Sequence, residues 1–259
     1  MTPDVAPGLH EKLVQLADLP RGGHGLDLGC GPGPTLAAWS AADPGARLTG
    51  LDYSTRALER ATAALDGHAG PVDLRVADLT EPLPLQDASV DALVAFNLIE
   101  CLTDPLSLIA EMHRVMKPGA LAVIGHTDFD ALVFAGANPE LDRRIVHAFA
   151  DLAEPWIGRA SDGRAGRNLP GLLASSPLHV ESVIVHTDYE TRLVGRAAHR
   201  VENVVSGLAS AIRHARTTVT EHDLSAWHAA LLEADRDSRF FFLETAVLVV
   251  AAKQRAPQG

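Results

Sequence analysis

The sequence predicts an α/β fold in which helices cover both faces of a mostly parallel sheet. Apolar, strand-like runs alternate along the chain with segments of helical periodicity, a pattern typical of strand–helix–strand units. A hydrophobic content of 47% in 259 residues allows a sizeable core. The third observation is the stretch 26–33, Leu-Asp-Leu-Gly-Cys-Gly-Pro-Gly, in which an apolar run leads into closely spaced glycines. A strand, a glycine turn and a helix together predict a site where the backbone approaches a ligand closely.

The spacing of these glycines narrows the choice of ligand. A dinucleotide fingerprint requires glycines at its first, third and sixth positions, whereas the sixth position counted from Gly29 is Pro34. The strand also contains Asp27, at a place where a dehydrogenase is more often apolar. A glycine turn that only connects a strand to a helix is the other interpretation that this short stretch leaves open.

Strands and helices are expected to alternate through the first half of the chain. An N-terminal helix over about 3–18 has leucines at helical spacing, and it would either cover the site as a lid or only cover the sheet edge. Turn signals at 43–45 and 117–119 end two later helices. Strands are expected at 24–28, 47–51, 72–76, 89–97 and 121–125, and helices at 35–42, 54–65 and 105–115.

We expect a single domain over 1–259, because the second half shows no linker and no internal repeat. A loop at 156–167 contains Trp156 and several arginines, and for any single arginine a solvated loop is the better interpretation. Helices are expected at 139–153, at 169–174 and twice within 194–236, strands at 179–189 and 240–252, and helical insertions over the sheet ends at about 127–178 and 194–236.

Charge and cysteine content restrict the partners and the compartment. The net charge of −11 disfavours nucleic acid and an anionic membrane surface, both of which need concentrated Lys and Arg. Because Cys30, one of two cysteines with Cys101, lies in the glycine loop, we expect no structural disulfide and a reducing compartment. We find no leader-like segment and no apolar run of ~20 residues. The histidines do not have the spacing of metal ligands. We therefore expect a cytoplasmic monomer or homodimer without a metal site.

Acidic residues follow the second and third strands. Asp52 comes about twenty residues after the glycine loop, where a carboxylate in a doubly wound sheet accepts hydrogen bonds from ribose hydroxyls. Asp78 follows the third strand, and 97–102 lies at the carboxyl end of the fourth. A ligand site is expected at this edge of the sheet, although ordinary solvated loop acids are the alternative.

Taken in order, these segments resemble the class I S-adenosylmethionine (SAM) methyltransferases, and within them the ubiquinone/menaquinone type. The resemblance covers 24–126 and includes Leu-Thr-Asp-Pro-Leu from position 102 and Glu-Met-His-Arg-Val-Met-Lys-Pro-Gly-Ala from position 111. It implies a Rossmann-like, seven-stranded, mostly parallel sheet with an antiparallel last strand. The chain departs from the pattern at Glu100, where relatives often have His, and at Ala120, where a second glycine is usual.

The resemblance also implies a cofactor and the residues that hold it. SAM would be the methyl donor and S-adenosylhomocysteine (SAH) the product. Asp27 would support the methionyl amino group, Asp52 the ribose and Asp78 the adenine, while the glycine loop would favour the methionyl carboxylate. The implied cofactor-binding residues are Asp27, Gly29, Cys30, Gly31, Gly33, Asp52, Tyr53, Ala77, Asp78, Leu79 and Asn97.

Methyl transfer is a direct displacement at carbon, for which the alignment of the reacting groups supplies much of the rate. An acceptor that loses a proton also benefits from a general base. Glu100 and His126 are the candidates, and His126 is the better one because its unperturbed pKa of ~6.5 lies close to working pH. The alternative is that both only hydrogen-bond loop backbone. Asn97, Asp128 and His10 are weaker candidates for the pocket.

The predicted function is that of a SAM-dependent methyltransferase for a small organic acceptor, in bacterial secondary metabolism. The acceptor atom is not readable from the sequence. Two alternatives remain at this point: a SAM-binding protein that transfers no methyl group, and an NAD-dependent oxidoreductase.

Overall fold

The computed structural model describes residues 8–152 and 163–255, which form two compact units. The first unit draws on 1–126, 168–184 and 248–259, and the second on 127–167 and 185–247. The chain passes twice from the first unit to the second and back, and the single domain over 1–259 stays a prediction. Three parts of these expectations lie outside the described residues: positions 3–7 of the N-terminal helix, the last position of the 139–153 helix, and Trp156.

The first unit is built on parallel strands in the order β3-β2-β1-β4-β5, with β8 next to β5. The register places Asp27 beside Gly50 and Val94, and pairs Phe96 with Gly125. The carboxyl ends of the strands therefore meet at one edge, where ligands bind in such sheets. The strands are β1 (His24–Leu28), β2 (Arg47–Asp52), β3 (Val72–Val76), β4 (Val90–Phe96), β5 (Met116–Thr127) and β8 (Phe241–Ala252).

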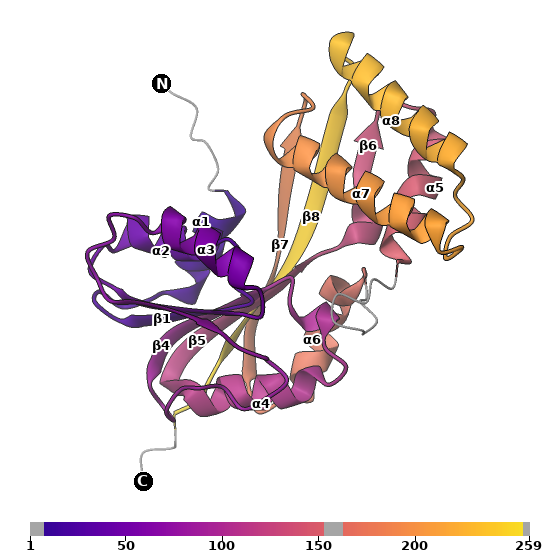
Figure 1. The fold of residues 1–259 in the computed structure, drawn as a ribbon. Helices are drawn as coiled ribbons and strands as arrows, with labels where there is room; N and C mark the ends of the chain where they lie inside the picture. Colours follow the sequence, from indigo (N-terminus) through magenta and orange to yellow (C-terminus); the bar gives the residue numbers. More distant parts are fainter. Residues whose placement is uncertain (1–7, 153–162, 256–259) are drawn as a thin grey trace. The chain divides into compact units, whose positions relative to one another are not determined.

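Helices cover both faces of this sheet. Figure 1 shows α1 (Leu9–Ala17), α2 (Pro34–Ala42) and α3 (Thr55–Ala64) on one face and α4 (Pro105–Val115) on the other. The caps follow from the sequence: Ser54 Oγ accepts from the N–H of Ala57 and Asp104 Oδ1 from that of Ser107. α6 (Ala165–Ala174) begins earlier than expected and contains Pro170.

The core of the first unit lies between the central strands and their helices. Leu26, Leu93, Ile124, Ile109 and Met112 are fully buried there. Strands of a parallel sheet are usually buried on both faces. The outer strand β3 is the exception, and the connection from β3 to β4, residues 77–89, contains no helix.

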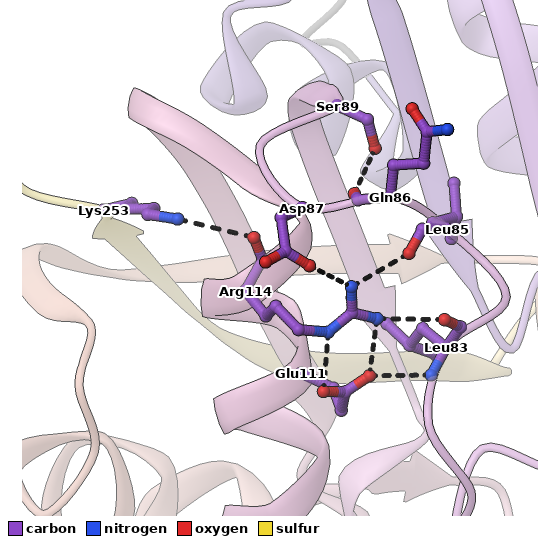
Figure 2. Close-up of polar contacts among 8 residues, drawn as sticks. All are labelled: Leu83, Leu85, Gln86, Asp87, Ser89, Glu111, Arg114 and Lys253. Carbon is purple, nitrogen blue, oxygen red and sulfur yellow. Dashed lines mark hydrogen bonds and ion pairs between the residues drawn. The ribbon is translucent and has the colours of Figure 1, made fainter.

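Two side chains of α4 hold this helix-free connection in place. Figure 2 shows Arg114 of α4 donating to the carbonyl oxygens of Leu83 and Leu85, both at 2.9 Å, and to Asp87 Oδ1 at 2.6 Å. Glu111 binds the same guanidinium, and its Oε2 accepts from the N–H of Leu83 at 2.8 Å. The loop is therefore fixed by both its carbonyl and its N–H groups.

The second unit packs helices against a small antiparallel pairing. Phe134 of β6 (Val133–Ala135) lies opposite Phe242 of β8, and the ring of Trp227 packs edge-on against Phe134 with centroids 5.2 Å apart. The capping box predicted at Thr220 and Asp223 is confirmed. The helices of this unit are the short η2 (Phe129–Ala131), α5 (Pro139–Ala150), α7 (Gly195–Arg213) and α8 (Glu221–Arg236). The strand β7 (His179–Glu190) begins in the first unit and ends in the second.

The predicted α/β fold class is confirmed, with two differences. The described residues form eight strands and not seven, because β6 adds a three-residue strand that pairs antiparallel with β8. β5 also begins at Met116 and not at Leu121, since Met116 pairs with Val90 across a register shift. Within the described residues, no helix combines the length and the apolar character that a bilayer crossing needs.

Candidate active site

The glycine loop lies between β1 and α2 in a conformation that favours glycine. Gly29, Gly31 and Gly33 have φ values of 68°, 52° and 83°. A Cβ on Gly33 would lie 3.0 Å from the Cβ of Ala61, so this glycine lets α3 approach the loop. At Gly31 no described atom beyond its two chain neighbours lies within 4 Å of the Cβ position. The middle glycine therefore faces space that a ligand can fill.

The N–H groups of this loop are largely bound to β2. Gly29 and Cys30 donate to the carbonyl oxygen of Leu51 at 2.8 and 3.1 Å, and Gly31 donates to Asp52 Oδ2 at 2.9 Å. These three donors are therefore already bound within the protein, and a contact between the loop and the methionyl carboxylate stays a prediction. Within the described residues, no side chain caps the N-terminus of α2, which leaves that helix end for an anion.

Asp27 is a buried carboxyl behind the loop. Its side chain is on β1, the residue is 3% exposed, and Oδ2 has no hydrogen-bond partner among the described residues. Burial, and then the negative charge of Asp52, raise the pKa of Asp27 well above its usual range. A buried carboxyl without a cation is costly on its own and fits a ligand that brings one.

Asp52 ends β2 and is also buried. Its Oδ1 accepts from the N–H of Ser54 at 2.8 Å, and its Oδ2 accepts from Gly31. A carboxylate oxygen has two acceptor positions, so each oxygen can still accept a ribose hydroxyl. Tyr53 follows at the same edge and is 53% exposed.

Ala77, Asp78 and Leu79 follow β3. The N–H of Ala77 donates to the carbonyl oxygen of Asp52 at 2.9 Å, which joins the ends of β2 and β3. Asp78 is exposed and its Oδ1 accepts from both the N–H and the hydroxyl of Thr80. The side chain of Leu79 belongs to the core, so this residue would reach a cofactor only through its backbone.

Asn97 turns the chain out of β4. It has a φ of 51°, which Asn tolerates better than most residues, and its N–H donates to the carbonyl oxygen of Gly125 at 2.9 Å. A Cβ on Gly29 would lie 3.2 Å from Leu98, so this turn packs against the glycine loop. Leu98 lies in the predicted 97–102 segment, but its packing role was not expected.

Glu100 and His126 come together at the same edge. Glu100 lies in the short helix η1 (Ile99–Cys101) after β4, and His126 is near the end of the neighbouring strand β5. His126 Nε2 is 3.6 Å from Glu100 Oε1, and the two residues are 0% and 9% exposed. Burial, with the nearby Glu100, raises the pKa of the Cys101 thiol to about 12. Cys101 therefore stays protonated and is no nucleophile at neutral pH.

His10 of α1 also lies near this edge. Its Nδ1 is 3.0 Å from the hydroxyl of Thr35, in the first turn of α2, and its ring packs edge-on against Phe96 at the end of β4. Sequence reasoning missed Thr35 and Phe96, because nothing in their local pattern reveals contacts across the fold. Whether α1 acts as a lid stays a prediction.

Asp128 and the neighbouring arginines belong to the second unit. Arg167 donates to both carboxylate oxygens of Asp128, at 2.7 and 2.8 Å. Arg164 donates to Asp130 and Asp151. These two arginines are therefore engaged in ion pairs, and Asp128 is a poor candidate for a base because its carboxylate is already held by a guanidinium.

Comparison with known proteins identifies the class of the domain. Residues 26–124 match the family model described as a methyltransferase domain. An uncharacterized methyltransferase of Mycobacteroides abscessus is 40% identical over 143 residues, which are 54% of this chain and 51% of that protein. Demethylmenaquinone methyltransferase of Bacillus licheniformis is 26% identical over 201 residues, 74% of this chain and 83% of that protein. A crystal structure of a Bacillus halodurans protein described as a methyltransferase has the same fold at 15% identity, with a TM-score of 0.60. The match covers 95% of this chain and 99% of that protein.

These matches confirm the resemblance found in the sequence. Residues 26–124 carry a class I methyltransferase domain, and the cofactor of this class is SAM. The site fits that cofactor, because Asp27 keeps a buried oxygen for a cation and Gly31 faces open space. The chain spans about half the length of several curated relatives that it matches, between 42% and 51% of each.

Proposed function

We propose that this protein is a SAM-dependent methyltransferase that acts on a small organic acceptor. The observation that carries the proposal is the meeting of two sets of residues at one edge of one sheet. One set, the glycine loop with Asp27 and Asp52, suits the methyl donor, and the other is the buried Glu100–His126 pair. A fold alone would not support an activity, but the residues of a site do.

SAM supplies an electrophilic methyl group on a positively charged sulfur. Asp27 binds the methionyl amino group, which provides the cation that its buried carboxyl lacks among the described residues. Asp52 accepts hydrogen bonds from the ribose hydroxyls, and Asp78 accepts one from the adenine amino group. These contacts fix the donor, so that the rate depends on how the acceptor is aligned with it.

His126 takes the proton that the acceptor loses. Its Nε2 faces Glu100 at 3.6 Å, and the negative carboxylate stabilises the imidazolium as it forms. Both side chains are buried, and a site that excludes water strengthens this interaction. An acceptor with an acidic O–H, N–H or C–H fits this arrangement.

The setting of the enzyme is part of the same proposal. We infer a bacterial enzyme of secondary metabolism that works in the cytoplasm as a monomer or homodimer and binds no nucleic acid. Support comes from the net charge of −11 and from the free cysteines Cys30 and Cys101.

Calorimetry and a transfer assay test the proposal together. We expect SAH to bind and NAD not to bind, and SAH to accumulate when SAM is supplied with an acceptor from a panel of phenols, amines and activated carbon acids. Binding of NAD alone would indicate an oxidoreductase. Binding of SAH without transfer to any acceptor would indicate a SAM-binding protein of another function.

The base is tested with the acceptor so found. His126→Gln is expected to lower the transfer rate by roughly 10²–10⁴-fold while SAH affinity stays unchanged. His222→Gln, at an exposed position of α8, is the matched control. A His126→Gln variant as fast as the control would contradict the assignment.

A further inference from the structure

A cavity of about 350 Å³ lies in the first unit, at the amino ends of the strands. Its walls come from His24 of β1, Arg47 and Thr49 of β2, Val72 of β3 and the loop 84–89. The cavity is open because the 77–89 connection has no helix to cover this part of the sheet. Its volume is within the range of small-molecule sites, and it lies at the edge opposite the glycine loop.

The loop wall of the cavity is held rigidly. Arg114 and Glu111 bind the backbone of Leu83, as Figure 2 shows. Arg75 Nη1 of β3 donates to the carbonyl oxygen of Pro84 at 3.1 Å. A wall with fixed backbone loses little freedom when a ligand binds.

Arg47 is the charged group that this cavity offers to a ligand. It forms no ion pair with any described residue, whereas the guanidinium of Arg75 is bound by Asp73. The formal charges of Arg47, Arg75 and Asp73 leave the lining positive, although the chain as a whole carries −11. An unpaired guanidinium beside a cavity suits a carboxylate, which it binds through two parallel hydrogen bonds.

His24 and Thr49 form a buried polar floor, 8% and 3% exposed. His24 Nδ1 is 3.1 Å from the carbonyl oxygen of Ser89, which can only accept, so the network assigns the proton to Nδ1. Nε2 is 2.8 Å from the hydroxyl of Thr49, which therefore donates to a neutral imidazole. When His24 is protonated, Nε2 donates instead, and the hydroxyl of Thr49 becomes free to donate to an anion.

Burial and the neighbouring charges set the protonation state of His24. Burial lowers its pKa, and Arg47 and Lys117 lower it further, while the contact with Ser89 and the charge of Asp91 oppose them. His24 is therefore neutral at neutral pH without a ligand. A carboxylate in the cavity adds a second negative charge beside it and favours the protonated form.

We propose that this cavity is a second ligand site, which binds a small organic carboxylate through Arg47 and takes up a proton at His24 as it does so. The ligand has an apolar body, because part of the lining is apolar: Pro71, Val72, Pro84 and Leu85. This inference does not depend on the proposed activity, since no residue of the cavity belongs to the candidate active site.

Benzoate binding, measured by calorimetry at about pH 6 and about pH 8, tests the proposal. We expect saturable binding that is several-fold tighter at the lower pH. Arg47→Gln should weaken it roughly tenfold or more, since a charged hydrogen bond is lost. Arg56→Gln, which removes an exposed arginine of α3, should bind as the wild type does.

Three results would overturn the proposal: no saturable binding at either pH, equal affinity at both, or unchanged binding in Arg47→Gln. Both variants should fold, because each position is exposed. Circular dichroism melting checks this expectation. SAH binding by the same variants reports separately on the opposite edge of the sheet, so the failure of either site is distinguishable.

Discussion

Two buried carboxylates of the second unit are neutralised differently from one buried carboxyl of the first. In the second unit, Asp128 is bound by Arg167 through two hydrogen bonds, and Glu244 Oε2 lies 2.9 Å from Nη2 of Arg200. In the first unit, Asp27 is as deeply buried but forms no ion pair with any described residue. All three acids are 5% exposed or less.

The difference separates acids that serve the fold from an acid that serves a ligand. A buried carboxylate with an arginine beside it is part of the packing, and breaking the pair leaves a charge uncompensated. A buried carboxyl without one weakens the fold, and such violations gather at functional sites. The comparison therefore predicts that removing the charge destabilises the fold at Asp128 or Glu244 and not at Asp27.

The largest expected effect is on the folding of the second unit. Glu244→Gln leaves Arg200 and Arg196 without their shared carboxylate, and it should cost about 3 kcal/mol of unfolding free energy in urea titrations. Glu233→Gln, at an exposed position of α8, should change it by less than about 0.5 kcal/mol. Equal unfolding free energies of the two variants would show that the ion pairs of Glu244 do not stabilise the second unit.

The next effect is on cofactor binding. Asp27→Asn keeps the shape of the side chain but removes the partner of the methionyl amino group, so SAH should bind about 100-fold more weakly in calorimetry. Asp66→Asn, in an exposed turn after α3, is the matched control and should bind normally. Wild-type affinity in Asp27→Asn would show that the cation binds elsewhere.

The smallest effect is on the stability of the protein without ligand. The pKa of Asp27 is raised in the folded state, so the fold holds this proton more tightly than the unfolded chain does, and stability falls as the pH rises above the unfolded pKa of about 3.9. Asp27→Asn cannot ionise and escapes this loss. Its melting temperature should therefore exceed that of the wild type at neutral pH, with an advantage that shrinks toward pH ~4. A variant that melts lower at neutral pH would contradict the raised pKa.

Much of the first unit could be predicted because its signals are local. The bounds of β3 and α4 were predicted correctly, since Asp104 and Pro105 mark a helix start that needs no tertiary information. The positions of Asp52 and Asp78 at one edge follow from parallel strands. The meeting of Glu100 and His126 follows for the same reason, because β4 and β5 are neighbours.

The rest could not be predicted, because it depends on contacts between distant residues. β6 is only three residues long, so its sequence cannot show the alternation of apolar and polar residues that predicts a strand. It is stabilised by its pairing with β8. The ion pair of Asp128 with Arg167 joins residues 39 positions apart. The bonds from Gly29 and Cys30 to Leu51 likewise appear only once β1 and β2 are paired.

Proton release on cofactor binding tests the central claim, which is that the buried carboxyl of Asp27 binds a cation of the ligand. The claim requires Asp27 to be protonated without ligand and ionised beside the amino group. Calorimetric titration of SAH at neutral pH, in two buffers of different ionisation enthalpy, should show a proton released by the wild type and none by Asp27→Asn. Binding without proton release by the wild type, or equal release by both proteins, would contradict the account.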